Sequence, residues 1–282
     1  MLGGALLDLL LAEGHEVRSL IREGSPRASR LDPSRGELVR GDAGEARDLR
    51  RALWGMDALV HVAGIEYAPT LLEAMRRTKV RRLLVVGTTS AHSAYEFRSG
   101  PGLRMERLVR ESGLDYTIVR PSMIYGSELD KNMHRLLRFL DRSPIFLIFG
   151  SGRNLWQPVY YEDCARGVYE ALVRSAAAGQ SYDLPGAEPL TYLDLVKTAA
   201  GALGRKPRIV RLPLEPVRRT LAAAERLRLP LPIDSDQVLR LREDKAYSYE
   251  KARRELDYAP RPFREGIALE VARLRELGMV RS

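Results

Sequence analysis

Residues that could bind or orient a ligand directly follow five apolar, strand-like runs near the start of the sequence. These runs alternate with helical ones, an order typical of parallel strands joined by helical crossovers. Ligands of parallel sheets bind outside the carboxyl ends of the strands, so the residues after each run are the first candidates for chemistry. They carry cationic, acidic, hydroxyl and small side chains: Arg22, Asp42, Ala63, Gly64, Thr88, Thr89, Ser90, Pro121 and Ser122.

Metal and thiol chemistry are not indicated. Cys164 is the single cysteine, which excludes a disulfide framework and a multi-cysteine metal site. The four histidines are scattered without ligand spacing, so we expect no structural metal. Cys164 shares a predicted helix with small and apolar residues and is interpreted as a packing residue. His61 and His92 lie near strand ends, and a lone histidine there is most often structural.

The elements that must position these residues follow from the hydrophobic pattern. Apolar residues at helical spacing predict a helix from residue 3 to about residue 13, which Gly14 ends. Strands, the first mostly buried, are predicted over 15–22, 37–42, 57–64, 81–90 and 115–122, with further helices over 44–53, 68–78 and 101–112. The expected fold is therefore an α/β fold with a doubly wound parallel sheet.

A smaller lobe is predicted after residue 125, where proline and glycine become frequent. Helices over 130–141, 162–174, 191–204 and 248–256 are separated there by short extended pieces. We expect this α/β lobe to close over the strand ends.

Composition limits the kinds of partner. The formal charge of +9 could suit a nucleic acid, an acidic membrane surface or a phosphorylated cofactor. The densest basic cluster, residues 76–82, lies at a predicted helix end without interleaved aromatic residues, which favours a solvated surface over a nucleic-acid site. No apolar stretch has the length of a membrane-spanning helix and the start lacks the features of a signal peptide, so a cytoplasmic protein is expected.

Six segments together resemble the extended and atypical short-chain dehydrogenases/reductases, the broad group of NAD(P)-dependent epimerases and dehydratases. The nearest resemblance is to the branch related to the NDUFA-type subunit of respiratory complex I and to NmrA-like proteins. The segments are LGGALLDLLLAEGHEVRSLIR, VRGDAGEARDLRRALWGMDALVHVAG, RLLVVGTTSAH, ESGLDYTIVRPSMIYG, WQPVYYEDCARGVYEAL and DLPGAEPLTYLDLVKTAAGALGR. The resemblance implies a Rossmann-type NAD(P)-binding domain over 1–125 and a substrate lobe over most of 126–282, from which residues 155–175 return to pack on the first domain.

The resemblance also implies a glycine-rich turn, G-x-x-G-x-x-G, between a first strand and the first helix, where the backbone approaches the cofactor pyrophosphate. Only the last of these glycines is present, as Gly3. We therefore expect the natural start to lie about ten residues upstream, or the protein to be truly truncated. Truncation is the harder alternative, because loss of a central strand would leave buried backbone groups unpaired, at about 1 to 3 kcal/mol each.

Cofactor contacts are carried over from the family residue by residue. The position of the acid that binds the ribose in NAD-preferring members is Ile21, followed by Arg22, which favours NADP and leaves NAD as the alternative. Asp42 and Ala43 match the pair that holds the adenine, although Asp42 could instead cap the next helix. Pro121 and Ser122 match the segment that packs on the nicotinamide. Ala63, Gly64 and Thr88 complete the expected cofactor site, together with Gly3.

Catalysis in the family uses a Ser or Thr, a Tyr and a Lys, in which the phenol transfers a proton and the lysine lowers its pKa. Ser90 matches the hydroxyl, with a simple strand-end turn as the alternative. Arg98 and Gly102 stand where the tyrosine and lysine are expected. Tyr95 is the candidate for a displaced acid, backed by Arg98 or Arg104.

Two further features of the sequence bear on the expected activity. Tyr125 matches a tyrosine that lines the substrate pocket of family members. The run Gly100 to Gly102, with Pro101, is expected to fray the helix that carries the catalytic pair.

The leading hypothesis is a protein that transfers hydride between a nicotinamide cofactor and a hydroxyl or carbonyl substrate, as an oxidoreductase or nucleotide-sugar epimerase. The alternative is a non-catalytic NADP(H)-binding sensor or assembly subunit, favoured by the substituted tyrosine and lysine. A nucleic-acid-binding protein rests only on the net charge. The substrate and the oligomeric state are left open.

Overall fold

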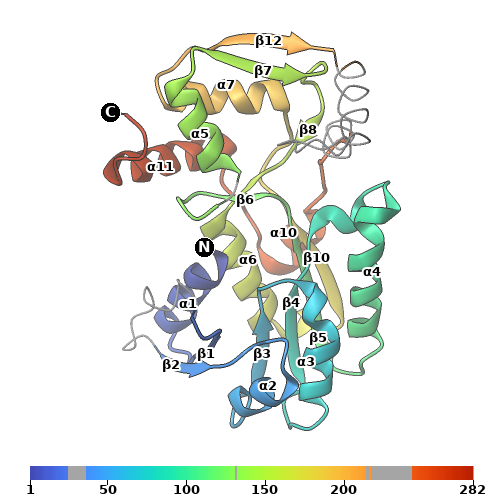
Figure 1. Ribbon diagram of the computed structural model, residues 1–282. Coiled ribbons are helices and arrows are strands. Elements are labelled where there is room, and N and C mark those ends of the chain that lie inside the picture. The colour runs from blue at the N-terminus through green and yellow to red at the C-terminus, as the bar shows by residue number, and fades with distance from the viewer. Residues whose placement is uncertain (25–35, 131, 214–215, 217–242, 282) are drawn as a thin grey trace, which may run out of the picture. The chain divides into compact units, whose positions relative to one another are not determined.

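The computed structural model describes residues 1–24, 36–130, 132–213, 216 and 243–281 (Figure 1). The chain divides into two compact units. Unit 1 consists of Met1–Ser122, Tyr161–Leu184 and Ser248–Ala259, and unit 2 of Met123–Tyr160, Pro185–Tyr247 and Pro260–Ser282. Among the described residues, no helix has the length and hydrophobicity of a membrane span.

Parallel strands dominate unit 1. One sheet has the order β10–β5–β4–β3, formed by β10 (Gln180–Leu184), β5 (Asp115–Pro121), β4 (Arg82–Val86) and β3 (Ala58–His61). A second sheet pairs β1 (Arg18–Ile21) with β2 (Glu37–Arg40). All these pairs are parallel, as the alternation of helices and strands predicted.

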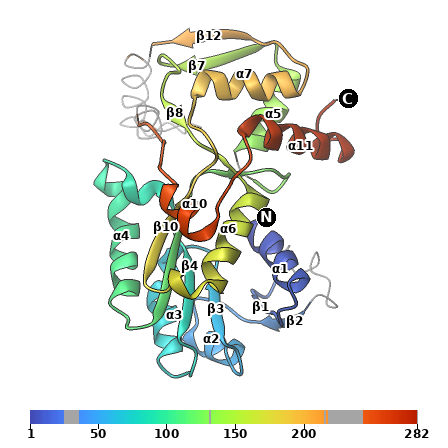
Figure 2. The same ribbon diagram turned by 180° about the vertical axis from the view of Figure 1, so that it is seen from behind.

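Helices join the strands of unit 1. They are α1 (Leu2–Ala12), α2 (Ala46–Ala52), α3 (Ala68–Met75), α4 (Glu96–Arg110), α6 (Tyr161–Val173) and α10 (Glu250–Leu256), with the short 3-10 helices η2 (Ile65–Tyr67), η3 (Thr89–His92) and η4 (Ser175–Ala177). Leu83 and Val85 of β4 belong to one hydrophobic cluster with residues of α2, α3 and α4. Side chains alternate along a strand, so the equally buried Leu84 points to the opposite face. The two views show helices on both sides of the sheet (Figures 1 and 2), and the predicted doubly wound α/β fold is confirmed.

Two local predictions for unit 1 were wrong. The helix expected from residue 101 begins at Glu96, and α4 continues through Gly100, Pro101 and Gly102 without a break. Pro101 lies in the second turn, where its missing N–H costs only one hydrogen bond, and the burial of Glu106 and Val109 anchors the rest of the helix. The first strand, β1, is only half-buried along its length.

Unit 2 contains short strand pairs and three longer helices among its described residues. The pairs are β6 (Ile124–Tyr125) with β9 (Val159–Tyr160), β7 (Ile145–Phe149) with β12 (Arg208–Leu212), and β8 (Leu155–Trp156) with β11 (Leu190–Thr191). The helices are α5 (Met133–Arg142), α7 (Tyr192–Ala202) and α11 (Phe263–Glu276). The sequence analysis did not predict α11, although Ile267, Val271 and Leu274 recur there at helical spacing and are buried.

Helix α11 in unit 2 carries a fully buried carboxyl group. Glu270 is fully buried, and among the described residues neither of its carboxyl oxygens has a hydrogen-bond partner of ordinary geometry. Burial and the neighbouring charge of Asp130 raise the pKa of Glu270 to about 10. The Asp130 carboxylate accepts hydrogen bonds from the backbone N–H groups of Met133 and His134 at the start of α5. Glu270 is therefore protonated in the folded protein at neutral pH.

This proton makes stability fall with rising pH. The folded protein holds it up to about pH 10, whereas the unfolded chain releases it near the ordinary value of 4.5. The contribution of Glu270 to stability is complete below its pKa in the unfolded chain and is lost as pH rises through its pKa in the folded protein. At pH 9 we expect Glu270→Gln to have a free energy of unfolding about 1 to 3 kcal/mol higher than the wild type and therefore to unfold at a higher temperature. This difference should be smaller at pH 5.

Thermal unfolding followed by circular dichroism measures this difference. Glu265→Gln is the matched control, because Glu265 lies exposed on the same helix. If the difference in melting temperature between the wild type and Glu270→Gln is the same at pH 5 and pH 9, Glu270 does not hold the proton.

Candidate functional site

The ends of β1, β2 and β3 meet at one place in unit 1. The Arg22 guanidinium, after β1, forms an ion pair with the Asp42 carboxylate, after β2, at an N–O distance of 3.1 Å. Arg22 also donates a hydrogen bond of 3.2 Å to the hydroxyl of Tyr67 in η2, which follows β3. Both charged side chains are largely solvent-exposed. The carboxyl ends of three strands thus present a cation and a carboxylate side by side.

The first turn of α1 lies against the end of β3. A Cβ atom added to Gly3 would lie 3.2 Å from Cγ2 of Val62, so a larger residue there would crowd this approach. Met1 provides no side-chain cap for α1, and the first turn contains no acidic residue. The exposed backbone at Gly3 and Gly4 therefore fits a negatively charged group such as a pyrophosphate.

Asp42 does not cap a helix. The N-cap of α2 is Glu45, and the Asp42 carboxylate instead accepts a hydrogen bond of 2.8 Å from the backbone N–H of Gly44. This tight turn corrects the capping alternative and keeps Asp42 next to Arg22. Ala43 packs against the hydrophobic cluster of unit 1.

The loop after β3 requires a glycine. Gly64 has a φ of 125°, and a Cβ there would overlap the carboxylate of Glu66. Ala63 beside it is exposed. His61, at the end of β3, is buried, and burial lowers its pKa. Its Nε2 has no hydrogen-bond partner among the residues that the structure describes, and the neutral ring packs against Tyr67.

The hydroxyl cluster after β4 forms the turn of η3. The Thr88 side chain accepts a hydrogen bond from the backbone N–H of Ser90 and caps this turn. Ser90 is half-buried within η3, and Tyr95 occupies the N-cap position of α4 with its ring against Phe97. Arg98 follows in the first turn of α4. The structure brings Ser90 and Tyr95 onto neighbouring segments, and their catalytic roles stay predictions.

The end of β5 lies beside β10. Pro121 is buried opposite Leu184, and the backbone N–H of Ser122 donates to the Leu184 carbonyl oxygen. Both residues are thus at the carboxyl edge of the sheet, and their contact with a nicotinamide stays a prediction.

Sequence reasoning missed a buried charge network at this edge. Glu106 of α4 is 1% exposed and binds Arg120 of β5 through two hydrogen bonds of 2.7 Å. Arg120 also reaches Asp183 of β10 at 3.4 Å, and Asp183 accepts from the ring Nε2 of His92 at 2.9 and 3.0 Å. Burial alone would raise the pKa of Glu106, but the hydrogen bonds and charges of Arg120 and Arg110 outweigh it and lower that pKa.

Tyr125 and Cys164 are core residues of different units. Tyr125, in unit 2, is 1% exposed and packs on the rings of Tyr160 and Phe263. Its expected role in a substrate pocket stays a prediction. Cys164, in unit 1, is fully buried, and burial raises the pKa of its thiol, which fits the predicted packing role.

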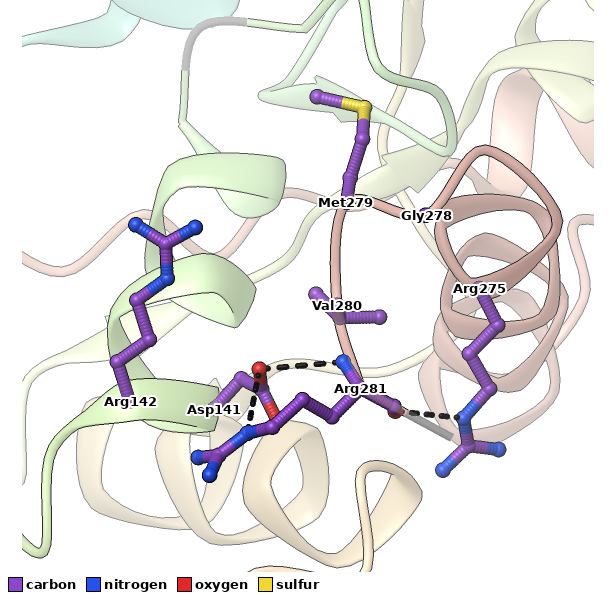
Figure 3. A pocket seen from close by; sticks show the side chains of 7 residues that line it. All are labelled: Asp141, Arg142, Arg275, Gly278, Met279, Val280 and Arg281. Atoms are coloured by element: carbon purple, nitrogen blue, oxygen red, sulfur yellow. Dashed lines mark hydrogen bonds and ion pairs between the residues drawn. The ribbon is translucent and has the colours of Figure 1, made fainter.

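A separate pocket of about 610 Å³ lies in unit 2, between α5 and the segment after α11 (Figure 3). The buried Asp141 carboxylate dominates it and binds the guanidinium and backbone N–H of Arg281 as well as the guanidinium of Arg205. These bonds tie the segment after α11 to α5. None of the predicted site residues lines this pocket.

Two family models match parts of this chain. Residues 1–135 match the model described as NAD(P)H-binding, and residues 103–184 match the model described as NAD dependent epimerase/dehydratase family. These matches confirm the predicted resemblance to NAD(P)-binding epimerases and dehydratases.

The relatives of this chain include a protein named as a reductase. It is 29% identical to ceramide reductase of Caulobacter vibrioides, over 71% of this chain and 69% of that protein. It is 24% identical to a mitochondrial NADH dehydrogenase alpha subcomplex subunit 9 of Arabidopsis thaliana, over 85% of this chain and 65% of that protein. An uncharacterised Mycobacterium tuberculosis protein is 27% identical, and the chain spans only 22% of its length.

Solved structures share the epimerase/dehydratase fold. The crystal structure of gox2253 has a TM-score of 0.83 with 22% identity, covering 100% of this chain and 97% of that one. UDP-glucose 4-epimerase of Thermotoga maritima has a TM-score of 0.76 with 18% identity, covering 98% of this chain and 96% of that one. Likeness at this level of identity is evidence for the fold.

The buried network makes a prediction about stability. Arg120→Met should leave the buried Glu106 carboxylate with Arg110 alone and destabilise the protein by about 3 to 5 kcal/mol. Because the Glu106 pKa is lowered, the pair stabilises above the ordinary value of 4.5, and this contribution is lost as pH falls. Urea unfolding at pH 7 and pH 4 measures both effects.

Two further variants interpret that measurement. Arg107→Met is the control, since Arg107 is exposed on the same helix, and it should change stability by less than about 0.5 kcal/mol. Removal of both partners in Glu106→Met/Arg120→Met should recover most of the loss. If the single Arg120 variant is as stable as the control, the pair is not the electrostatic centre of this edge.

Proposed function

We propose that the chain binds a nicotinamide dinucleotide at the carboxyl edge of unit 1 and catalyses hydride transfer to or from a hydroxyl or carbonyl substrate. The adjacent strand ends of β1, β2 and β3 support this proposal, because Arg22, Asp42 and the first turn of α1 would there supply the cation, the hydrogen-bond acceptor and the N–H groups that a dinucleotide needs. When bound, the nicotinamide supplies the hydride chemistry.

Each group of the cofactor has a matching residue. The backbone at Gly3 and Gly4 would hold the pyrophosphate, and Asp42 with Ala43 would hold the adenine. Gly64 would allow the backbone to approach the ligand closely, since its φ of 125° is a conformation that residues with a Cβ rarely adopt. Thr88, Pro121 and Ser122 would line the nicotinamide end.

NADP is proposed as the preferred cofactor. Arg22 is exposed and directly follows Ile21, the position where an acid would otherwise exclude the 2′-phosphate. The Arg22 guanidinium already forms an ion pair with the Asp42 carboxylate. A 2′-phosphate at Arg22 would therefore be a second anion that binds the same guanidinium. The preference for NADP over NAD should therefore be modest rather than absolute.

The enzyme reading is favoured over the non-catalytic alternative. Curated relatives bear the names ceramide reductase and NAD(P)H azoreductase, and a solved structural neighbour is named as an epimerase. The substrate class, a carbonyl compound or a nucleotide sugar, is the finer part of the proposal. Incubation with NADPH and a panel of ketones and UDP-sugars tests it by loss of absorbance at the nicotinamide band or by chromatography of the sugar products.

The cofactor preference gives a sharp binding test. We expect Arg22→Ala to weaken NADPH binding about tenfold, equal to about 1.4 kcal/mol, and to change NADH binding much less, because only NADPH carries the 2′-phosphate. Nicotinamide fluorescence during titration measures both affinities. Arg47→Ala is the control, as the Arg47 side chain is 87% exposed on α2. Equal losses for NADPH and NADH would contradict the assignment of Arg22.

A further inference from the structure

The Arg22 guanidinium uses only part of its hydrogen-bonding capacity within the protein. A guanidinium carries five N–H groups in one rigid plane. The Nε group faces the Asp42 carboxylate at 3.1 Å, and one N–H of Nη2 donates to the Tyr67 hydroxyl at 3.2 Å. Among the described residues, both N–H groups of Nη1 and the second one of Nη2 therefore have no partner. The side chain is 63% exposed, so a ligand can reach it.

The two contacts of Arg22 fix the plane of its guanidinium. Nε and Nη2 form one edge of that plane, and Asp42 and Tyr67 occupy this edge from two different strand ends. The unpartnered N–H groups include the pair on Nη1 and Nη2 that forms the end of the guanidinium. Such a pair of parallel donors binds two oxygens of a phosphate or carboxylate at once.

The Tyr67 hydroxyl is a second donor beside this cation. Its oxygen accepts the hydrogen bond from Arg22, so its own proton is directed elsewhere. No acceptor for that proton lies within the part of the chain that the structure describes. A phenolic hydroxyl rotates about its C–O bond. The proton can therefore turn to an oxygen of a ligand that binds at Arg22.

Packing holds the Tyr67 ring in place. The ring lies against His61 with a distance of 5.2 Å between the ring centres, and it contacts the hydrophobic cluster of unit 1. The loop after β2 lies close on another side, since a Cβ at Gly44 would be 3.9 Å from Cε1 of Tyr67. None of these contacts uses the hydroxyl, so Tyr67→Phe removes the hydroxyl and keeps the packing.

These donors match the group that distinguishes the two nicotinamide cofactors. A phosphate monoester offers three charged terminal oxygens as strong acceptors, whereas the ribose hydroxyl in the same position of NADH is uncharged. Asp42, the residue proposed to hold the adenine, is the ion-pair partner of Arg22. The ribose is bonded directly to the adenine, so a group on its 2′ position would come close to Arg22 and Tyr67.

We propose that Tyr67 is a specificity-determining residue for NADPH: its hydroxyl holds the Arg22 guanidinium and donates its own proton to the ribose 2′-phosphate. This inference rests on the proposed function. It adds a residue from the end of β3 to a preference that the sequence analysis assigned to Arg22 alone.

The first experiment compares the two cofactors by nicotinamide fluorescence during titration. Tyr67→Phe should weaken NADPH binding about fivefold, the effect of one hydrogen bond, and NADH binding by less than about twofold. A general loss of structure would weaken both cofactors, so the ratio of the two affinities is the decisive quantity. Equal losses for NADPH and NADH overturn the proposal, and so does an unchanged ratio.

Tyr116→Phe is the matched control. Tyr116 packs against the same hydrophobic cluster as Tyr67, but it lies near the amino end of β5, away from the edge that carries Arg22. This variant should keep the affinities of the wild type for both cofactors. Thermal unfolding checks that each variant is folded.

The second experiment tests whether Tyr67 acts together with Arg22. In Arg22→Ala the hydroxyl has no guanidinium to hold, so adding Tyr67→Phe should weaken NADPH binding by less than about twofold. A full fivefold loss in that background means that the two residues act independently, and it overturns the claim that Tyr67 holds Arg22 for the phosphate.

A third measurement removes the nicotinamide from the comparison. The fragments 2′,5′-ADP and 5′-AMP differ only by the 2′-phosphate, and both can displace NADPH from the protein. The wild type should bind 2′,5′-ADP more tightly than 5′-AMP, and Tyr67→Phe should reduce this difference about fivefold. A difference that Tyr67→Phe leaves unchanged contradicts the role of the hydroxyl.

The outcomes separate the two claims. A wild type that binds neither NADPH nor NADH overturns the proposed function and the role of Tyr67 with it. A wild type that binds both cofactors equally well keeps the dinucleotide site and overturns the phosphate contact of Arg22 and Tyr67. A wild type that prefers NADPH while Tyr67→Phe keeps the full preference overturns only the role of Tyr67.

Discussion

The common direction of the strands in unit 1 is the constraint on which the rest of the structure depends. Each parallel strand must be followed by a crossover, and in β3, β4 and β5 the residues after the strand begin short turns or loops at the same edge. This is why Arg22, Asp42 and Tyr67 meet although the sequence separates them. A polar surface with free backbone N–H groups then arises beside an apolar core, which is the environment that a dinucleotide requires.

A buried ion pair stabilises the other side of this edge. Glu106 is removed from water, and its two hydrogen bonds to Arg120 offset the cost of burying both charges. The pair also fixes the position of Asp183 through Arg120. The residues that hold α4 on β5 are therefore connected through Asp183 to the imidazole of His92.

The sequence predicted the elements better than the contacts. Alternating apolar runs were sufficient for the doubly wound sheet, because buried parallel strands and their crossovers have a strong period in the sequence. The start of α4 was misplaced, since glycine and proline weaken a helix only locally and tertiary burial of Glu106 and Val109 decides the outcome. The Asp183 to His92 bond joins residues on different elements, and no local pattern indicates such a pair.

The family resemblance predicted the fold and the NAD(P)-binding domain, whereas the residues for proton transfer stay predictions. The family positions of tyrosine and lysine are Arg98 and Gly102 here, and helix α4 nonetheless forms. The structure therefore separates two questions that the family pattern combines: whether the edge is built to bind a dinucleotide, and which side chain moves the proton.

The most direct test of the central claim is a map of the NADPH site by two-dimensional ¹⁵N–¹H NMR of the whole protein during titration with NADPH. The account predicts that the largest shift changes fall on the backbone amides of Gly3, Arg22, Gly64 and the η3 turn, all in unit 1. Shift changes confined to the pocket around Asp141 in unit 2, or no changes at saturating NADPH, would contradict it.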